Sequence, residues 1–337
     1  MRLFEKGIYR AAAEQNKLYY NRRFVNSTTW INMKKIFLFF IISLVVIGLI
    51  LVLEIKGIIT WRWEFTKNKS ANLEVAFMDI GQGDAAILKF PNGQTMLVDC
   101  GKDASILSAL GRNLPWSKRD LDYLVITHPH ADHFGGCLDV LARFKVHHIY
   151  VNGYAGDHGQ LFESFNSAIK NEIRVDGAEN IILSASESLE IGSTTIRFIY
   201  PDHDLGKDPR IPASQAPLDI NDTSVVLKVS YGTQDILLTG DMEKPLENYL
   251  IQKDRHILGA EIFKAGHHGS DSSSGEEFIT AVQPDFCIIS SGKGNSYGHP
   301  HGSTVRRLER MGCEVLRTDQ RGDILMTITS STSVVEK

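Results

Sequence analysis

A chain of 337 residues with 43% hydrophobic and 23% charged residues has an ordinary globular composition, long enough for one large domain or two modest ones. A formal charge of −4 and a pI near 6.3 exclude a protein that binds nucleic acid or an anionic membrane surface through its net charge. Any polyanion would therefore have to be held locally, by metal ions.

The first apolar segment predicts a membrane span. From residue 36 to residue 53 only Ser43 and Gly48 interrupt an apolar run, which at about 1.5 Å per helical residue spans roughly 27 Å of hydrocarbon. A core helix would show a polar face, and this stretch has none. Residues 1–35 carry eight Lys or Arg against two Glu, whereas residues 54–75 carry four against three. The N-terminus should therefore stay in the cytoplasm and the large domain outside.

The start of the chain and the fate of this span are open to two interpretations each. Met33-Lys34-Lys35 before the apolar run looks like a signal start, so Met33 could be the true initiator. No small-x-small cleavage site follows Leu53, which favours an uncleaved anchor over a removed signal peptide. We expect a single-pass protein of the cell membrane; the sequence does not indicate its oligomeric state. Its parts are a cytoplasmic segment (1–35), a transmembrane anchor (36–53), a linker (54–72) and an extracytoplasmic domain (73–337).

Beyond the linker, short β-branched runs alternate with helical ones. Strands are expected at residues 73–78, 85–90, 95–98, 123–127 and 148–151, with Pro91-Asn92-Gly93 as a hairpin turn. Helices are expected at residues 105–113 and 134–144.

A second set of elements begins at residue 188. Strands are expected at residues 188–191, 195–200, 224–230, 235–239, 261–264, 286–290 and at the C-terminus. Helices are expected near residues 244–252, 275–281 and 304–311. Two mixed sheets with helices outside give an α/β sandwich.

The cysteines lie far apart, with no C-x-x-C pair and no thiolate zinc spacing; they are Cys100, Cys137, Cys287 and Cys313. We expect them to be buried small hydrophobic side chains, although the sequence leaves a disulfide open.

Three imidazoles and one carboxylate lie within the run His128-Pro129-His130-Ala131-Asp132-His133, directly after an apolar strand. Neutral imidazole nitrogen and carboxylate oxygen are ligands that zinc or manganese prefers, at about 2.0–2.2 Å for zinc. Because the chain has twelve histidines in all, this density favours a metal site over a polar surface loop.

These residues resemble the H-x-H-x-D-H signature of the metallo-β-lactamase superfamily, whose αββα sandwich carries two metals at the edge between its sheets. The resemblance covers about residues 73–330. It implies that His128 and His130 ligate one metal, and that Asp132 and His133 ligate the other. It also implies that Asp241, at the end of an apolar strand, bridges the two cations. Taken alone, Gly-Asp after a strand would be a turn or a helix cap.

Further motifs resemble the external hydrolase domain of the ComEC competence proteins, which form a DNA-uptake channel. They lie at residues 75–84, 97–101, 221–224, 264–270 and 295–300. Within them, Asp79 and Asp99 could orient the ligating histidines or simply form turns.

Three histidines near the C-terminal end are further candidates for the site. By its order along the chain, His299 matches the superfamily's final metal-binding histidine, with a plain Gly-His-Pro turn as the alternative. His267 and His268 are neighbours and would face opposite ways in an extended strand. We expect one of them to contact the scissile phosphate or donate a proton. His301 should lie on the surface.

One departure from the superfamily pattern concerns the first metal. The superfamily usually supplies a third histidine to it between the histidine run and the bridging aspartate, and here the candidates are Asn221 and Asp222. His203 lies in the same interval, but its context is that of a variable loop. The first metal could be weakly held or absent, and an oxygen ligand there would favour manganese over zinc.

We therefore expect a hydrolase with two divalent metal ions, acting as a phosphodiesterase or nuclease of the ComEC type on DNA outside the cell. Asp132 would orient the attacking water, and His267 or His268 would assist the departing oxygen. With one expected span the chain lacks the channel, so transport is not implied. Alternatives are hydrolysis of a cell-wall or lipid phosphodiester, opening of a β-lactam or lactone, and a non-catalytic, metal-stabilised binding module.

Overall fold

A computed structural model describes residues 38–39, 41–44, 72–156, 159–212 and 219–335. The chain forms two compact units, Met1–Thr66 and Lys67–Lys337. The expected cytoplasmic segment, and the linker up to residue 71, lie outside the described residues. So does most of the expected anchor, of which residues 38–39 and 41–44 are helical. Among the residues that are described, none belongs to a helix with the length and apolarity that a membrane crossing requires.

The first sheet has eight strands in the order β15-β14-β1-β2-β3-β4-β5-β6. Its strands are β1 (Leu73–Phe77), β2 (Ala86–Lys89), β3 (Thr95–Val98), β4 (Asp120–Ile126), β5 (Lys145–Val151), β6 (Glu179–Ile182), β14 (Ile324–Ile328) and β15 (Ser333–Val335). The pairs from β15 to β3 are antiparallel, and those from β3 to β6 are parallel.

The second sheet has seven strands in the order β13-β12-β11-β10-β9-β8-β7. Its strands are β7 (Glu187–Ile191), β8 (Thr194–Tyr200), β9 (Val226–Tyr231), β10 (Gln234–Leu238), β11 (Ile262–Lys264), β12 (Phe286–Ile289) and β13 (Glu314–Arg317). The pairs from β7 to β10 are antiparallel and those from β10 to β13 are parallel. Both sheets are mixed, as expected.

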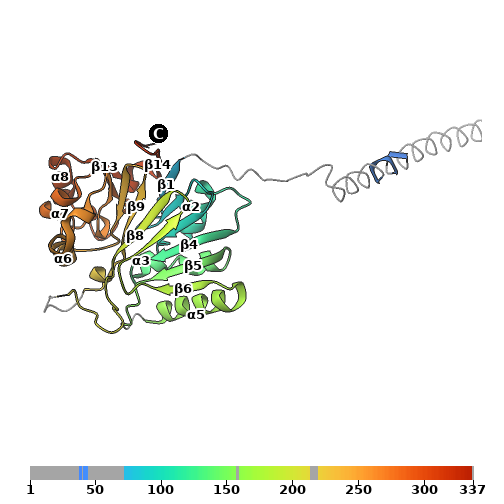
Figure 1. Ribbon diagram of the computed structural model, residues 1–337, viewed down its shortest axis with the longest axis horizontal. Helices are drawn as coiled ribbons and strands as arrows, with labels where there is room; N and C mark the ends of the chain where they lie inside the picture. Colours follow the sequence, from blue (N-terminus) through green and yellow to red (C-terminus); the bar gives the residue numbers. More distant parts are fainter. Residues whose placement is uncertain (1–37, 40, 45–71, 157–158, 213–218, 336–337) are drawn as a thin grey trace, which may run out of the picture. The chain divides into compact units, whose positions relative to one another are not determined.

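Helices cover the outer face of each sheet (Figure 1). The first sheet is covered by α2 (Ser105–Asn113), α3 (Ala131–Phe134), α4 (Cys137–Leu141) and α5 (Gly159–Asp176). The second is covered by α6 (Lys244–Asp254), α7 (Glu276–Val282) and α8 (Gly302–Arg310). Shorter helices are η1 (Asn221–Thr223), η2 (Arg255–Leu258), η3 (His267–Gly269) and α9 (Thr318–Arg321).

Alternate residues along a strand enter different core layers, because successive side chains leave a strand on opposite faces. Val75 and Phe77 of β1 pack between the two sheets, whereas Ala76 packs under the helices of the first sheet. Both faces of the inner strands are buried, so β2, β3, β11 and β12 read as nearly continuous apolar runs, whereas the edge strands β6 and β7 are largely exposed. The four layers confirm the expected αββα sandwich.

Two local predictions were wrong or incomplete. Residues 134–144 do not form one helix, because Gly135 and Gly136 separate α3 from α4. A Cβ atom at Gly135 would lie 2.2 Å from the backbone oxygen of Lys102, so the chain passes too closely there for a side chain. No element was predicted for residues 152–187, where the structure has α5 and β6. Buried Phe165 and Ile169 show the helical spacing that could have identified α5.

The cysteines are buried but paired, which corrects the expectation of unpaired hydrophobic side chains. Cys100 bonds Cys137 with a Cα–Cα distance of 5.2 Å, and Cys287 bonds Cys313 with a Cα–Cα distance of 5.9 Å. The partners lie 37 residues apart in the first pair and 26 in the second, so tertiary packing brings them together. Spacing in the sequence therefore gave no sign of either bond.

Candidate metal centre

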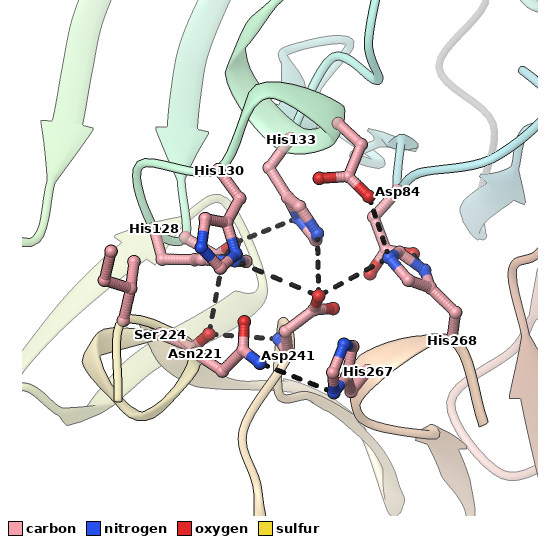
Figure 2. A network of polar contacts seen from close by, with 12 residues as sticks. Asp84, His128, His130, His133, Asn221, Ser224, Asp241, His267 and His268 are labelled. Carbon is pink, nitrogen blue, oxygen red and sulfur yellow. Dashed lines mark hydrogen bonds and ion pairs between the residues drawn. The ribbon is translucent and has the colours of Figure 1, made fainter. Parts of the chain in front are cut away.

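The ends of strands from both sheets deliver polar side chains to one edge of the sandwich. Asp99 follows β3 and the histidine run follows β4 in the first sheet. Asp241 follows β10, and His267-His268 follow β11, in the second sheet. Figure 2 shows Asp241 between the side chains of the two sheets, joined by contacts to His128, His133 and His268.

The first cluster consists of His128, His130 and Asp241, whose ligand atoms lie within 4.8 Å of one another. Nε2 of His128 lies 3.0 Å from Nδ1 of His130 and 3.9 Å from Oδ2 of Asp241. Burial lowers the pKa of His128 well below its usual value. Its ring is therefore neutral, which is the form that binds a metal ion.

The second cluster consists of Asp132, His133 and His268, again around Asp241. Oδ2 of Asp241 lies 3.2 Å from Nε2 of His133 and 3.4 Å from Nε2 of His268, and Oδ2 of Asp132 lies 3.3 Å from the latter. Ligand atoms about 2.1 Å from a tetrahedral ion would lie about 3.4 Å apart. The two Nε2 atoms have no hydrogen-bond partner among the described residues. The donor set therefore fits a bound cation.

The carboxylates also govern protonation in the second cluster. Burial opposes a proton on His133, but the Asp241 and Asp99 carboxylates raise its pKa well above the usual value. Burial likewise opposes a proton on His268, but Asp241 and Asp84 raise its pKa to about 10. A cation bound by these rings would have to displace those protons.

Asp99 holds two of the rings from behind. Its carboxylate accepts a hydrogen bond from Nδ1 of His133 at 2.8 Å and from the hydroxyl of Thr127 at 2.7 Å. That hydroxyl in turn lies 3.1 Å from Nδ1 of His128. With both Nδ1 atoms engaged, each Nε2 faces Asp241, so Asp99 is an orienting residue. Asp79 instead accepts the backbone N–H of Gly81, as a turn former does.

His268 is held in the same way, by groups that sequence reasoning did not assign. Its Nδ1 lies 3.1 Å from the backbone oxygen of Ser290 and 3.2 Å from Oδ1 of Asp84. The other oxygen of Asp84 pairs with Nζ of Lys264 at 2.7 Å, and both side chains are buried. The signal available in the sequence was an isolated lysine at the end of a buried strand.

His267 lies on the open side of the centre. Its Nδ1 lies 2.7 Å from Oε1 of Glu243, a carboxylate that also accepts the hydroxyl of Ser272 at 2.8 Å. The expectation that His267 and His268 face opposite ways was wrong, because both line one cavity. Their φ angles are +45° and +51°, so they form a left-handed turn rather than a strand.

Two more predicted ligands lie beside the clusters. His299 lines the same cavity, and its buried Nδ1 has no hydrogen-bond partner in the described chain, but it belongs to neither cluster. Burial, and to a smaller extent repulsion from the His267 and His268 rings, lowers the pKa of His299 to about 4. Asn221 is buried with Oδ1 unpartnered among the described residues, while its Nδ2 lies 3.2 Å from Oε1 of Glu243.

The remaining candidates lie apart from the centre. Asp222 turns away and accepts the backbone N–H of Glu243 at the start of α6. His203 pairs with Asp202 at 2.8 Å, and half-exposed His301 accepts the backbone N–H of Asp271.

A cavity of about 260 Å³ opens onto the centre. Its lining residues are Gln82, His130, Ala131, Asp132, Asp241, His267, His268, Tyr297 and His299. Gly83 brings the backbone close to this wall, since a Cβ atom there would lie 2.2 Å from the backbone oxygen of Asp132.

Comparison with known proteins places this geometry in a family. Residues 78–292 match the metallo-beta-lactamase superfamily. ComE operon protein 3 of Bacillus subtilis is 32% identical over 277 residues, covering 76% of this chain and 33% of that protein. Competence protein ComA of Neisseria gonorrhoeae is 29% identical over 274 residues, covering 80% of this chain and 34% of that protein. The chain thus spans about a third of the length of these relatives.

Among solved structures, the metallo-beta-lactamase fold protein YhfI from Bacillus subtilis matches with a TM-score of 0.49 and 13% identity, over 76% of this chain and 99% of that one. The chain belongs to the metallo-β-lactamase superfamily, and its domain is related to competence proteins of the ComEC family.

Proposed function

We propose that this chain is a membrane-anchored, metal-dependent phosphodiesterase that cuts DNA outside the cell. The observation that carries the proposal is the sharing of Asp241 by two clusters of ligand atoms beside one cavity. An arrangement of two metals on one bridging carboxylate is suited to an in-line displacement at phosphorus. The relatedness to competence proteins favours DNA among the phosphodiesters.

The donor atoms divide into two sets. His128, His130 and Asp241 would hold one ion, with the unpartnered Oδ1 of Asn221 available to complete its shell. His133 and Asp241, with Asp132 and His268, would hold the other. In this proposal His268 would take the place that the sequence had suggested for His299.

The mixed set of imidazole nitrogens with carboxylate and amide oxygens suits manganese as well as zinc. When bound, such ions supply Lewis acidity and ease the ionisation of water.

The chain's own groups would position water and move a proton. Asp132 lines the cavity and would orient the attacking water through its carboxylate. His267 would protonate the departing oxygen, because its Nδ1 is bound to Glu243 and its ring also lines the cavity. Burial lowers the pKa of His267, but the hydrogen bond to Glu243 raises it above its usual value, which favours the proton-donating form.

The two disulfides support a location outside the cytoplasm. Structural disulfides form and persist in oxidising compartments and are rare in the cytosol. This fits the positive charge of residues 1–35, which favours an inside N-terminus and an outside domain.

The test is a substrate panel with the full chain purified in detergent. Manganese, zinc or neither is supplied, and the substrates are single-stranded DNA, bis(p-nitrophenyl) phosphate and a chromogenic cephalosporin. We expect metal-dependent cleavage of the two phosphodiesters, lost in Asp241→Ala together with bound metal measured by elemental analysis. Asp139→Ala, which removes a carboxylate from the surface of α4, should retain both the cleavage activity and the bound metal. Turnover of the cephalosporin alone would reject the proposal.

A further inference from the structure

An exposed aromatic side chain stands at the mouth of the cavity. Tyr297 lines the cavity wall and yet leaves 66% of its surface open to solvent. Single exposed aromatic side chains are ordinary on protein surfaces, so what distinguishes Tyr297 is its place on the wall of this cavity. At this position its ring can contact a substrate that enters the cavity.

The loop that carries Tyr297 is tied down. Oδ1 of Asn295 accepts the backbone N–H groups of Tyr297 and His299, each at 3.1 Å. Nδ2 of Asn295 donates to the backbone oxygen of Gly292 at 2.8 Å and also to that of His299. The N–H of Gly292 donates to the side chain of Gln82 on another part of the cavity wall. The ring is thus presented from a fixed loop, which lowers the entropic cost of binding against it.

One face of the Tyr297 ring is already supported by a second ring. Tyr297 and His299 are stacked, with centroids 6.0 Å apart and planes inclined by 23°. His299 is in turn packed edge-on against His267 and His301, at 5.2 Å and 5.0 Å. The stack leads from the proposed proton donor His267 outwards to solvent, where the ring of Tyr297 remains open.

We infer that the ring of Tyr297 stacks on the nucleobase next to the scissile phosphate and so selects single-stranded nucleic acid. The inference rests on the proposed phosphodiesterase function and names its substrate class. Cations held by the donor atoms around Asp241 would take the phosphate, whereas Tyr297 offers a broad π-face at the rim. A base in a duplex has both faces covered, so only an unpaired, unstacked base can lie against it. Stacking tolerates any base, so it predicts cleavage without sequence preference.

The test uses a substrate with one phosphodiester bond. The dinucleotide TpT and three analogues, lacking the 5′ base, the 3′ base or both, are given to the full chain in detergent with manganese. Stacking contributes about 1–3 kcal/mol per base, so Tyr297→Ala should lower kcat/KM for TpT about 5- to 150-fold. Tyr297→Phe and Tyr297→Trp should retain it. Trp116→Ala removes an 86% exposed ring from the α2–β4 loop and should change nothing.

The analogues separate stacking from a structural role. For the wild type, removal of one of the two bases should lower kcat/KM by the same factor as Tyr297→Ala does on TpT. For Tyr297→Ala, removal of that base should lower kcat/KM no further. The analogue without bases should be cut equally by both proteins. Equal cleavage of TpT by wild type and Tyr297→Ala, or an equal loss on the analogue without bases, would overturn the inference.

A binding measurement keeps the inference independent of turnover. A dinucleotide with 2-aminopurine in place of one base loses fluorescence when that base stacks. Wild type should quench it and Tyr297→Ala should not. If wild type cuts no phosphodiester, the proposed function fails while this measurement still decides the stacking. Absence of quenching with wild type would sink the stacking alone.

Discussion

Replacing Lys264 by methionine tests whether the ion pair behind the centre holds the fold together. Nζ of Lys264 lies 2.7 Å from Oδ2 of Asp84, and only 5% and 9% of the two side-chain surfaces are exposed. With a cation bound, His268 would be neutral, which would leave Lys264 as the positive charge on Asp84. Methionine would fill the space but would leave a buried carboxylate without its partner.

Leaving one charge of a buried pair uncompensated costs about 3–5 kcal/mol. The expected loss in melting temperature is on the order of 10 °C for a domain of this size. Urea denaturation of the full chain with excess manganese measures the loss in unfolding free energy, and a thermal melt measures the loss in melting temperature. The double variant Asp84→Asn, Lys264→Met removes both charges and should recover most of the loss.

The chain offers a matched control for burial. Lys89 and Glu74 form an ion pair with the same 2.7 Å separation, but 30% and 36% of their side-chain surfaces are exposed. Because exposed pairs contribute about 0–1 kcal/mol, Lys89→Met should be nearly neutral. The reasoning is refuted if Lys264→Met and Lys89→Met cost the same, or if the double variant is no more stable than Lys264→Met.

Three further outcomes are expected. Asp99→Asn should weaken metal binding about 10- to 100-fold, since it loosens the hold on two ligating rings, and competition with a chelating dye measures this against Asp79→Asn as control. Burial raises the pKa of Glu247 to about 7, so the folded state binds the extra proton. The contribution of Glu247 to the unfolding free energy should therefore fall by about 3 kcal/mol as pH rises from about 4.5 to 7. Urea midpoints should show a shallower fall in Glu247→Gln. Replacing both Cys100 and Cys137 by serine opens a loop of 37 residues and should cost about 4 kcal/mol in urea denaturation.

Each of these has a contrary result. Equal metal affinity in the Asp99 and Asp79 variants would mean that Asp99 only shapes a turn. A stability that rises with pH over the same window in wild type, and falls in Glu247→Gln, would reverse the assigned sign. An unchanged midpoint in the double serine variant would show that packing alone holds those segments together.

The layers and most strands could be predicted because a strand that is buried on both faces consists of consecutive apolar residues. The histidine run and Asp241 were identifiable because the ligand types cluster or follow an apolar strand. Asp84, Lys264 and Glu243 were not assigned, since each acts through a contact with a residue far away in the chain. The order of His267, His268 and His299 was insufficient, because a left-handed turn decides which ring faces Asp241.

The matching order of the two sheets has a consequence for how the molecule could come apart. Each contains three antiparallel pairs followed by three parallel ones, from β14 to β6 and from β7 to β13. Strands of the first sheet position His128 and Asp132, and strands of the second position Asp241 and His268. An ion bound by ligands from both sheets would cross-link the two layers of the sandwich, and sliding of one layer against the other would separate its ligands. Two fragments divided near residue 187 would each carry only part of the ligand set, and the second would also carry β14 and β15 of the first sheet. Metal uptake would therefore report their reassembly.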